Sequence, residues 1–92
     1  MIKSFRDKDT ETLFGGMRVP KLQAIEAVAR RKLEMLNAAK NLLDLTKPPA
    51  NRLEALKGDR QGQHSIRVND QYRVCFVWKD GDAHDVEVVD YH

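Results

Sequence analysis

The last third of the chain, QHSIRVNDQYRVCFVWKDGDAHDVEVVDYH (residues 63–92), decides the fold. Apolar side chains recur in it at every second position, which is the period of β-strands that bury one face. Asn69-Asp70 predicts one tight turn, and Asp80-Gly81 is typical of a type I′ hairpin turn. The stretch therefore predicts an antiparallel meander of three strands. The residues expected on its buried face are Ile66, Val68, Val74, Phe76, Val86 and Val88.

The chain begins with a short strand candidate at residues 2–5. The residues between it and the meander show a helical period. Asp7 or Asp9 is a candidate N-cap for a first helix that Gly15-Gly16 ends. Pro20 suits the first turn of a second, longer helix. The apolar stripe of that helix runs through Leu22, Ile25, Ala29, Leu33, Leu36 and Ala39 toward Leu43. The predicted fold is α+β, a β-α-α segment followed by the meander, with the helices packed on one face of the sheet.

Composition limits the classes of protein to consider. The chain has 92 residues, which fits a single domain spanning residues 1–92, and a formal net charge of +2. No apolar run approaches the roughly 18 residues that a membrane span needs, and the N-terminus lacks the apolar core of a signal peptide. The single cysteine, Cys75, excludes an internal disulfide and is expected to be a packing residue. We therefore expect a cytoplasmic protein that makes no membrane contact.

The charges are unevenly distributed along this weakly charged chain. Residues 1–50 carry ten Lys and Arg against six Asp and Glu, whereas residues 74–92 carry one Lys and five acids. Strand alternation places Arg67 and Arg73 opposite the buried face, where burial of an unpaired guanidinium is avoided. An open sheet face that carries arginines is suited to phosphate groups. The residues alone therefore allow a polyanionic partner.

The chain ends on three side chains that exchange protons, Asp90, Tyr91 and His92. They are either the mobile end of a terminal strand or part of a functional site. Alternation would place Asp90 and His92 on the buried face beside Val86 and Val88, which is unfavourable for ionisable groups. We therefore expect the alternation to break near residue 90.

Other motifs carry less information about chemistry. The segment KGDR (57–60) is expected to be an exposed turn that enters the meander. The histidines and acids of the C-terminal half follow no recognised spacing of metal ligands, and the chain has no Gly-rich phosphate loop. No metal ion or cofactor is therefore expected.

Four segments together resemble the HigB branch of the RelE-like bacterial toxins: MIKSF (1–5), LKGDR (56–60), SIRVNDQYRVCF (65–76) and VEVVDYH (86–92). The likeness spans nearly the whole chain, and the LKG-x-R turn combined with a terminal DYH is its most specific part. It implies a compact α+β toxin of a type II toxin–antitoxin module, which enters the ribosomal A site and cuts translated mRNA without a metal ion. The implied partners are mRNA, the 70S ribosome and a HigA-like helix-turn-helix antitoxin that forms a heterotetramer with the toxin.

The resemblance also implies a set of functional residues. The catalytic positions of the family fall on Lys57, Arg73, Asp90, Tyr91 and His92. Arg60 in the predicted turn and Arg67 on the open face are predicted to bind RNA. Where some HigB toxins carry a catalytic histidine, this chain has Glu54, which is either a substitute base or a structural residue.

Metal-free RNA cleavage needs a nucleophilic 2′-oxygen, a stabilised pentavalent phosphate and a proton for the leaving 5′-oxygen. In our hypothesis His92 and Asp90 transfer the protons. Lys57 and Arg73 stabilise the negative charge that develops on the phosphate. Tyr91 is expected to stack on a base or to hydrogen-bond to the phosphate. Two alternatives stay open: an RNA- or ribosome-binding inhibitor that cuts nothing, and an interaction domain whose open face docks another protein.

Overall fold

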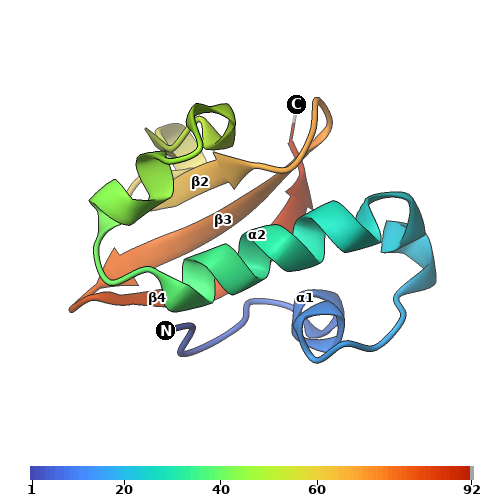
Figure 1. Cartoon of the computed structure of the whole chain (residues 1–92). Coiled ribbons are helices and arrows are strands. Elements are labelled where there is room, and N and C mark those ends of the chain that lie inside the picture. The colour runs from blue at the N-terminus through green and yellow to red at the C-terminus, as the bar shows by residue number, and fades with distance from the viewer. Residues whose placement is uncertain (92) are drawn as a thin grey trace.

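A computed structural model of the chain describes residues 1–91 (Figure 1). Its helices and strands are, in chain order, α1 (Lys8–Phe14), α2 (Glu26–Ala38), β1 (Glu54–Ala55), β2 (His64–Arg67), β3 (Tyr72–Lys79) and β4 (Asp82–Asp90). Short 3₁₀ segments lie at Pro20–Ile25, Leu42–Thr46, Pro49–Asn51 and Gly58–Arg60. The strands are ordered β1-β2-β3-β4 across one antiparallel sheet. The predicted α+β class and the meander, here β2-β3-β4, are confirmed.

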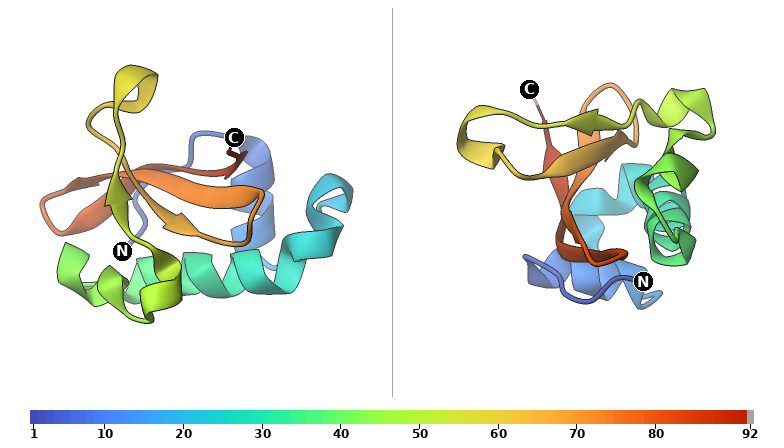
Figure 2. Two further views of the ribbon diagram at one scale, coloured as in Figure 1. Left: turned by 90° about the horizontal axis from the view of Figure 1, so that it is seen from above. Right: turned by 90° about the vertical axis from the view of Figure 1, so that its left-hand side faces the viewer.

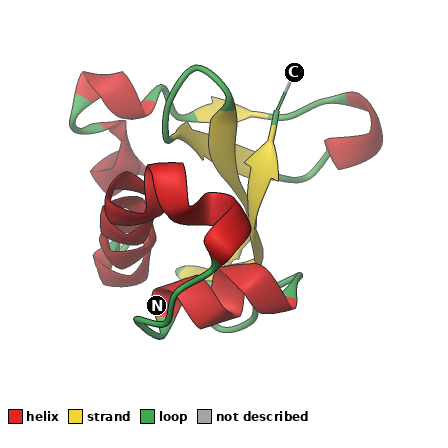
Figure 3. Cartoon of the chain, turned by 90° about the vertical axis from the view of Figure 1, so that its right-hand side faces the viewer, coloured by secondary structure: helices red, strands yellow, loops and turns green. Residues whose placement is uncertain are grey.

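The helices lie together on one side of the sheet, with α2 across its face and α1 beside β4 (Figures 1 and 3). The predicted apolar stripe is buried at Leu22, Ile25, Ala29, Leu33, Leu36 and Ala39. These residues share one hydrophobic cluster with the predicted buried face of the meander. Removal of this apolar surface from water is the main term that favours folding. No helix within residues 1–91 is long and apolar enough to cross a membrane.

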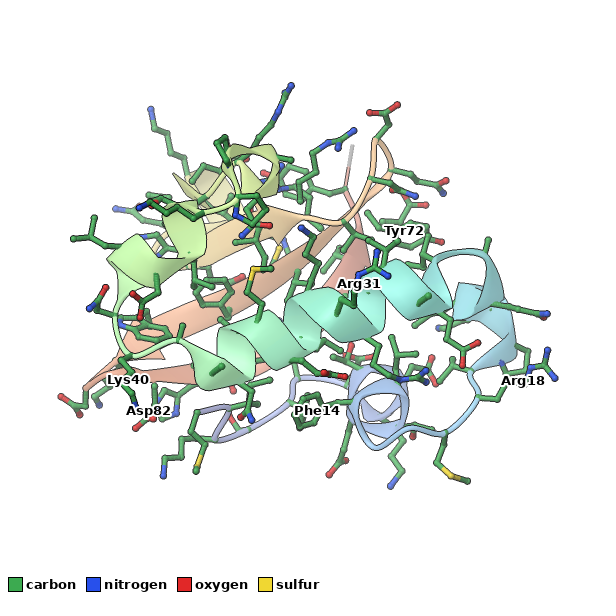
Figure 4. All side chains as sticks on the ribbon, in the orientation of Figure 1. Phe14, Arg18, Arg31, Lys40, Tyr72 and Asp82 are labelled. Atoms are coloured by element: carbon green, nitrogen blue, oxygen red, sulfur yellow. The ribbon has the colours of Figure 1, made fainter. Side chains whose placement is uncertain are left out.

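Two local signals read from the sequence are confirmed in detail. Asp7 caps α1, and its carboxylate accepts a hydrogen bond from the Thr10 backbone N–H at 3.2 Å. Asp80 (φ 54°) and Gly81 (φ 80°) both adopt left-handed backbone, as a type I′ turn requires. That turn lies beside the chain that leaves α2, at the end of the molecule where Figure 4 labels Lys40 and Asp82.

The longer helix differs from its prediction at both ends. It begins as the 3₁₀ segment Pro20–Ile25 and becomes α-helical only afterwards. It does not reach Leu43, because the chain leaves the helix at Ala39, whose ψ is 137°. Leu43 is consequently 75% exposed, and Leu45 is buried in its place.

The N-terminal segment does not form the predicted strand. Ile2 and Phe5 make two isolated parallel bridges to β4 instead. Between these bridges β4 bulges at Asp85, which has a φ of 52° and whose N–H donates to the Ser4 hydroxyl at 2.8 Å. The bulge interrupts the backbone ladder, and so no continuous strand forms.

The alternation of β4 does not break near residue 90, contrary to our expectation. Asp90 pairs with Tyr72 in the same register that pairs Val88 with Val74. The irregularity lies further back, between Cys75 and Val77 of β3. Asp90 is nevertheless exposed, because the end of β4 projects past α2 (Figures 1 and 2). An ionisable group on the helix-facing side is therefore tolerated there.

Candidate RNA-binding and active site

The face of the sheet away from α2 is the open face. Arg67 and Arg73 pair with each other across β2 and β3. The next pair, Ile66 and Val74, is buried in the core, so the two arginines lie on the open face, as predicted. Figures 2 and 3 show the chain around Gly58–Arg60 standing out on this same side of the sheet. No enclosed pocket is present in the described part of the chain.

Arg73, on β3, is held by acceptors from β2 and from the chain before β1. Its Nε donates to Ser65 Oγ at 2.7 Å, and its Nη2 donates to the Arg52 carbonyl oxygen at 2.6 Å. The same Nη2 lies 3.7 Å from a carboxylate oxygen of Glu54. Within residues 1–91, Nη1 makes no hydrogen bond. The guanidinium is thus anchored on one edge, and the donors of the other edge remain for an anion.

The strand β1 brings Glu54 to this site. The sequence pattern did not predict β1, since two residues are too few to show a period. Pairing with β2 places Glu54 opposite Ser65. Ser65 is in turn opposite Cys75, two residues along β3 from Arg73. Just before β1, Arg52 has left-handed backbone (φ 46°), and its carbonyl oxygen accepts the bond from Arg73. The Glu54 side chain is 51% exposed, so its carboxylate is accessible to a ligand as well as to Arg73.

The C-terminal residues divide between the two sides of the sheet. The Tyr91 ring lies on the side of Arg73, with its centroid 6.0 Å from the guanidinium carbon. Its backbone N–H donates to the Gln71 carbonyl at 2.7 Å, which ties the end of the chain to β3. Asp90 Oδ2 accepts from Gln71 Nε2 at 3.0 Å. His92, which we also expect at the site, lies outside the described residues.

The predicted cations differ in how they are paired. Lys57 is exposed just before the turn at Gly58–Arg60, and it makes no ion pair within residues 1–91. Arg60, by contrast, binds Glu87 at 3.3 Å, which ties the turn to β4, and Arg67 is paired with Asp70. Lys57 is therefore the predicted cation most open to phosphate. Arg73 is only 12% exposed and lies beside Glu54, so what it offers an anion is Nη1, which makes no hydrogen bond within residues 1–91.

Sequence reasoning missed two residues at this site, Ser65 and Glu87. The period-two pattern already placed Ser65 on the face of Arg67 and Arg73, but nothing in it signalled a hydrogen bond to a guanidinium. Glu87 was counted only among the five acids of residues 74–92, whereas it lies 3.8 Å from Arg6 as well as near Arg60. The bond of Ser65 to Arg73 crosses the β2–β3 hairpin, whereas the contacts of Glu87 join residues much farther apart in sequence.

Cys75 lies on the same face but is fully buried, as expected of a packing residue. Burial raises the pKa of its thiol, so the reactive thiolate is disfavoured. No three His, Cys, Asp or Glu side chains within residues 1–91 converge so as to hold a metal ion. The functional groups that this face presents include a guanidinium, a lysine, carboxylates and a phenol.

Comparison with known proteins agrees with this fold and identifies the family of the chain. Residues 3–92 match the family model of the RelE-like toxin of type II toxin–antitoxin systems, HigB. The chain belongs to this family. It is similar to Toxin HigB-1 of Vibrio cholerae, with 45% identity over 85 residues that cover 90% of each protein. It is also 34% identical over 94 residues to Endoribonuclease HigB of Proteus vulgaris, with both proteins fully covered. The resemblance seen in the sequence is thereby confirmed.

Solved structures share the fold of this HigB-family chain at low sequence identity. One is a chain of the heterotetrameric YoeB–YefM toxin–antitoxin complex of Staphylococcus aureus, with a TM-score of 0.63 and 15% identity. It covers all of this chain and 98% of that one. A second YoeB–YefM complex from the same organism has a TM-score of 0.57 and 17% identity. At these identities the likeness concerns the fold alone.

Proposed function

We propose that this HigB-family toxin is a metal-independent endoribonuclease that cuts translated mRNA in the ribosomal A site. The observation that carries the proposal is the Arg73 guanidinium, anchored on the open face with Nη1 available and with Glu54 and Tyr91 beside it. The name of the Proteus vulgaris relative, an endoribonuclease, supports the same activity.

In the proposed reaction the 2′-oxygen of the RNA attacks the adjacent phosphorus, and the bond from phosphorus to the 5′-oxygen breaks. Glu54 takes the proton of the 2′-hydroxyl, because its carboxylate is accessible and lies beside the guanidinium that receives the phosphate. Arg73 and Lys57 stabilise the charge that develops on the phosphate oxygens. Tyr91 stacks on a base next to the cut.

The proton for the leaving 5′-oxygen comes from His92 in this proposal, because Asp90 is on the other side of the sheet from Arg73. Asp90 lies at the exposed end of β4, and His92 follows Tyr91 directly. The role of His92 rests on the family resemblance. Histidine suits proton transfer because its side chain titrates near neutral pH.

The proposed partners follow from the family and from the related complexes. A helix-turn-helix antitoxin of the HigA kind, in a heterotetramer with the toxin, would neutralise the chain, as the YoeB–YefM complexes support by analogy of fold. Because translated mRNA is the proposed substrate, the toxin would act in the cytoplasm. The whole chain, residues 1–92, would act as one domain.

The proposal is tested by inducing the protein alone in bacteria and mapping mRNA ends by primer extension. We expect new ends inside translated frames, which disappear with Arg73→Ala or on removal of residues 90–92. Arg18→Ala is the matched control, because Arg18 is an exposed arginine that projects from the helix-side loop (Figure 4). Growth arrest with intact mRNA would instead identify a toxin that binds RNA or the ribosome without cutting.

A further inference from the structure

We infer that Ser65 is a positioning residue, which holds the Arg73 guanidinium in the orientation that binds the scissile phosphate. The inference deepens the proposed function and rests on it. It concerns a residue that the family resemblance did not single out. It follows from the burial of Ser65, from its bond to Arg73 and from the position of Glu54.

Ser65 has the surroundings of a residue kept for its hydroxyl group. It lies in the middle of β2, fully buried, between Glu54 on one neighbouring strand and Cys75 on the other. Serine has no large side chain to pack in a strand, and a buried hydroxyl is costly unless it is hydrogen-bonded. Its Oγ accepts from Arg73 Nε at 2.7 Å. That bond is the compensation for burying the hydroxyl.

The bond decides which way the guanidinium points. A guanidinium is planar, so an acceptor at Nε and another at Nη2 fix the plane of the whole group. Here Ser65 Oγ holds Nε and the Arg52 carbonyl holds Nη2, with Nη1 left on the opposite side. Without the hydroxyl, Nε–H loses its partner, and the nearest carboxylate, Glu54, competes for the freed edge. A guanidinium turned toward Glu54 would no longer present Nη1 to a phosphate.

The test compares Ser65→Ala with Cys75→Ala. The two residues face each other across β2 and β3, both are fully buried, and each substitution removes one heavy atom. Of these two side chains, Ser65 hydrogen-bonds to Arg73 and Cys75 makes no such bond within the described residues. In single-turnover cleavage of mRNA on programmed ribosomes, we expect Ser65→Ala to lower the rate constant at saturating ribosomes about tenfold, as loss of a hydrogen bond to a charged group does. Cys75→Ala should leave it unchanged. Equal losses in the two variants would mean that packing alone matters, and would overturn the inference.

A double-substitution cycle separates positioning from a direct role of Ser65. Lysine at position 73 has one ammonium and cannot be held by the same fork of acceptors. In an Arg73→Lys background, Ser65→Ala should therefore cause no further loss of rate. A further tenfold loss there would show that Ser65 acts independently of Arg73, against the inference.

A measurement without RNA keeps this inference separate from the proposed function. The Nε–H resonance of Arg73 in a ¹⁵N-labelled sample should shift, and exchange faster with water, in Ser65→Ala but not in Cys75→Ala. An unchanged resonance in Ser65→Ala overturns the inference whatever the cleavage assay gives. Absence of cleavage by the unsubstituted protein, with the expected change of resonance, counts against the proposed function alone.

Discussion

The Arg73 guanidinium and the Glu54 carboxylate lie 3.7 Å apart on the open face, although they belong to strands separated by β2. The pair places an accessible carboxylate beside the cation that we propose receives phosphate. By the family resemblance Glu54 occupies the position of a histidine found in some HigB toxins, and we propose that it serves as the proton acceptor here.

Substitution of Glu54 tests this role directly. Glu54→Gln keeps the shape of the side chain but cannot take a proton, and we expect cleavage to fall by about 10²-fold or more. Glu54→His should retain much more activity, because histidine is a competent base at neutral pH. Single-turnover cleavage on programmed ribosomes measures both. Glu34→Gln, an exposed glutamate of α2, is the control, and full activity of Glu54→Gln would assign Glu54 a structural role.

A buried hydroxyl on α1 holds the strand that carries the C-terminal residues. Thr10 is fully buried, and its Oγ1 accepts from the Val88 backbone N–H at 2.9 Å. Thr10→Val keeps the shape but leaves that N–H unpaired, so we expect a loss of about 1–3 kcal/mol in the free energy of unfolding. Urea denaturation measures it. Thr12→Val, in the same helix but only partly buried, should have a smaller effect.

Two leucines in the 3₁₀ segment after α2 differ in burial and so test where the helix ends. Leu45 is fully buried and Leu43 is 75% exposed. Leu45→Ala should lower the free energy of unfolding by about 2–5 kcal/mol, because it leaves a cavity. Leu43→Ala should change it little, as surface substitutions usually do. Similar losses in the two variants would contradict the observed end of the helix.

The capped turn at Leu42–Thr46 predicts a dependence of stability on pH. The backbone N–H of Lys40, and then that of Asn41, donate to the Asp44 carboxylate and lower its pKa below the ordinary 3.8. Because the pKa is lower in the folded state, the ionised group favours folding above pH 3.8, and this contribution is lost as the pH falls through the folded value.

Asp44→Asn should therefore reduce stability near neutral pH, and its difference from the unsubstituted protein should shrink in acid. Urea midpoints at pH 7 and pH 3 measure both effects. Asp59→Asn, at an exposed acid of the turn before β2, is the control. A difference between Asp44→Asn and the unsubstituted protein that stays constant across this range would contradict the capping role.

Local sequence was sufficient for most of the secondary structure. The type I′ turn at Asp80-Gly81 and the cap at Asp7 depend on residues within a few positions of each other, and both are present as predicted. The faces of Arg67 and Arg73 followed from alternation alone. The same reasoning was wrong about the strand at residues 2–5 and about a break near residue 90, because a bulge in β4 and the reach of α2 decide those features.

The sequence by itself determined the α+β class, the arginines on an open sheet face and the HigB family. Those features depend on periodicity and on motifs that neighbouring residues carry. Only the tertiary structure decided which groups meet at the site: β1 brings Glu54 to Arg73, Ser65 holds the guanidinium, and Glu87 neutralises Arg60. The physical reason is that hydrogen bonds and ion pairs act over a few ångströms in space. Strand pairing, which sets those distances, joins residues that the sequence keeps apart.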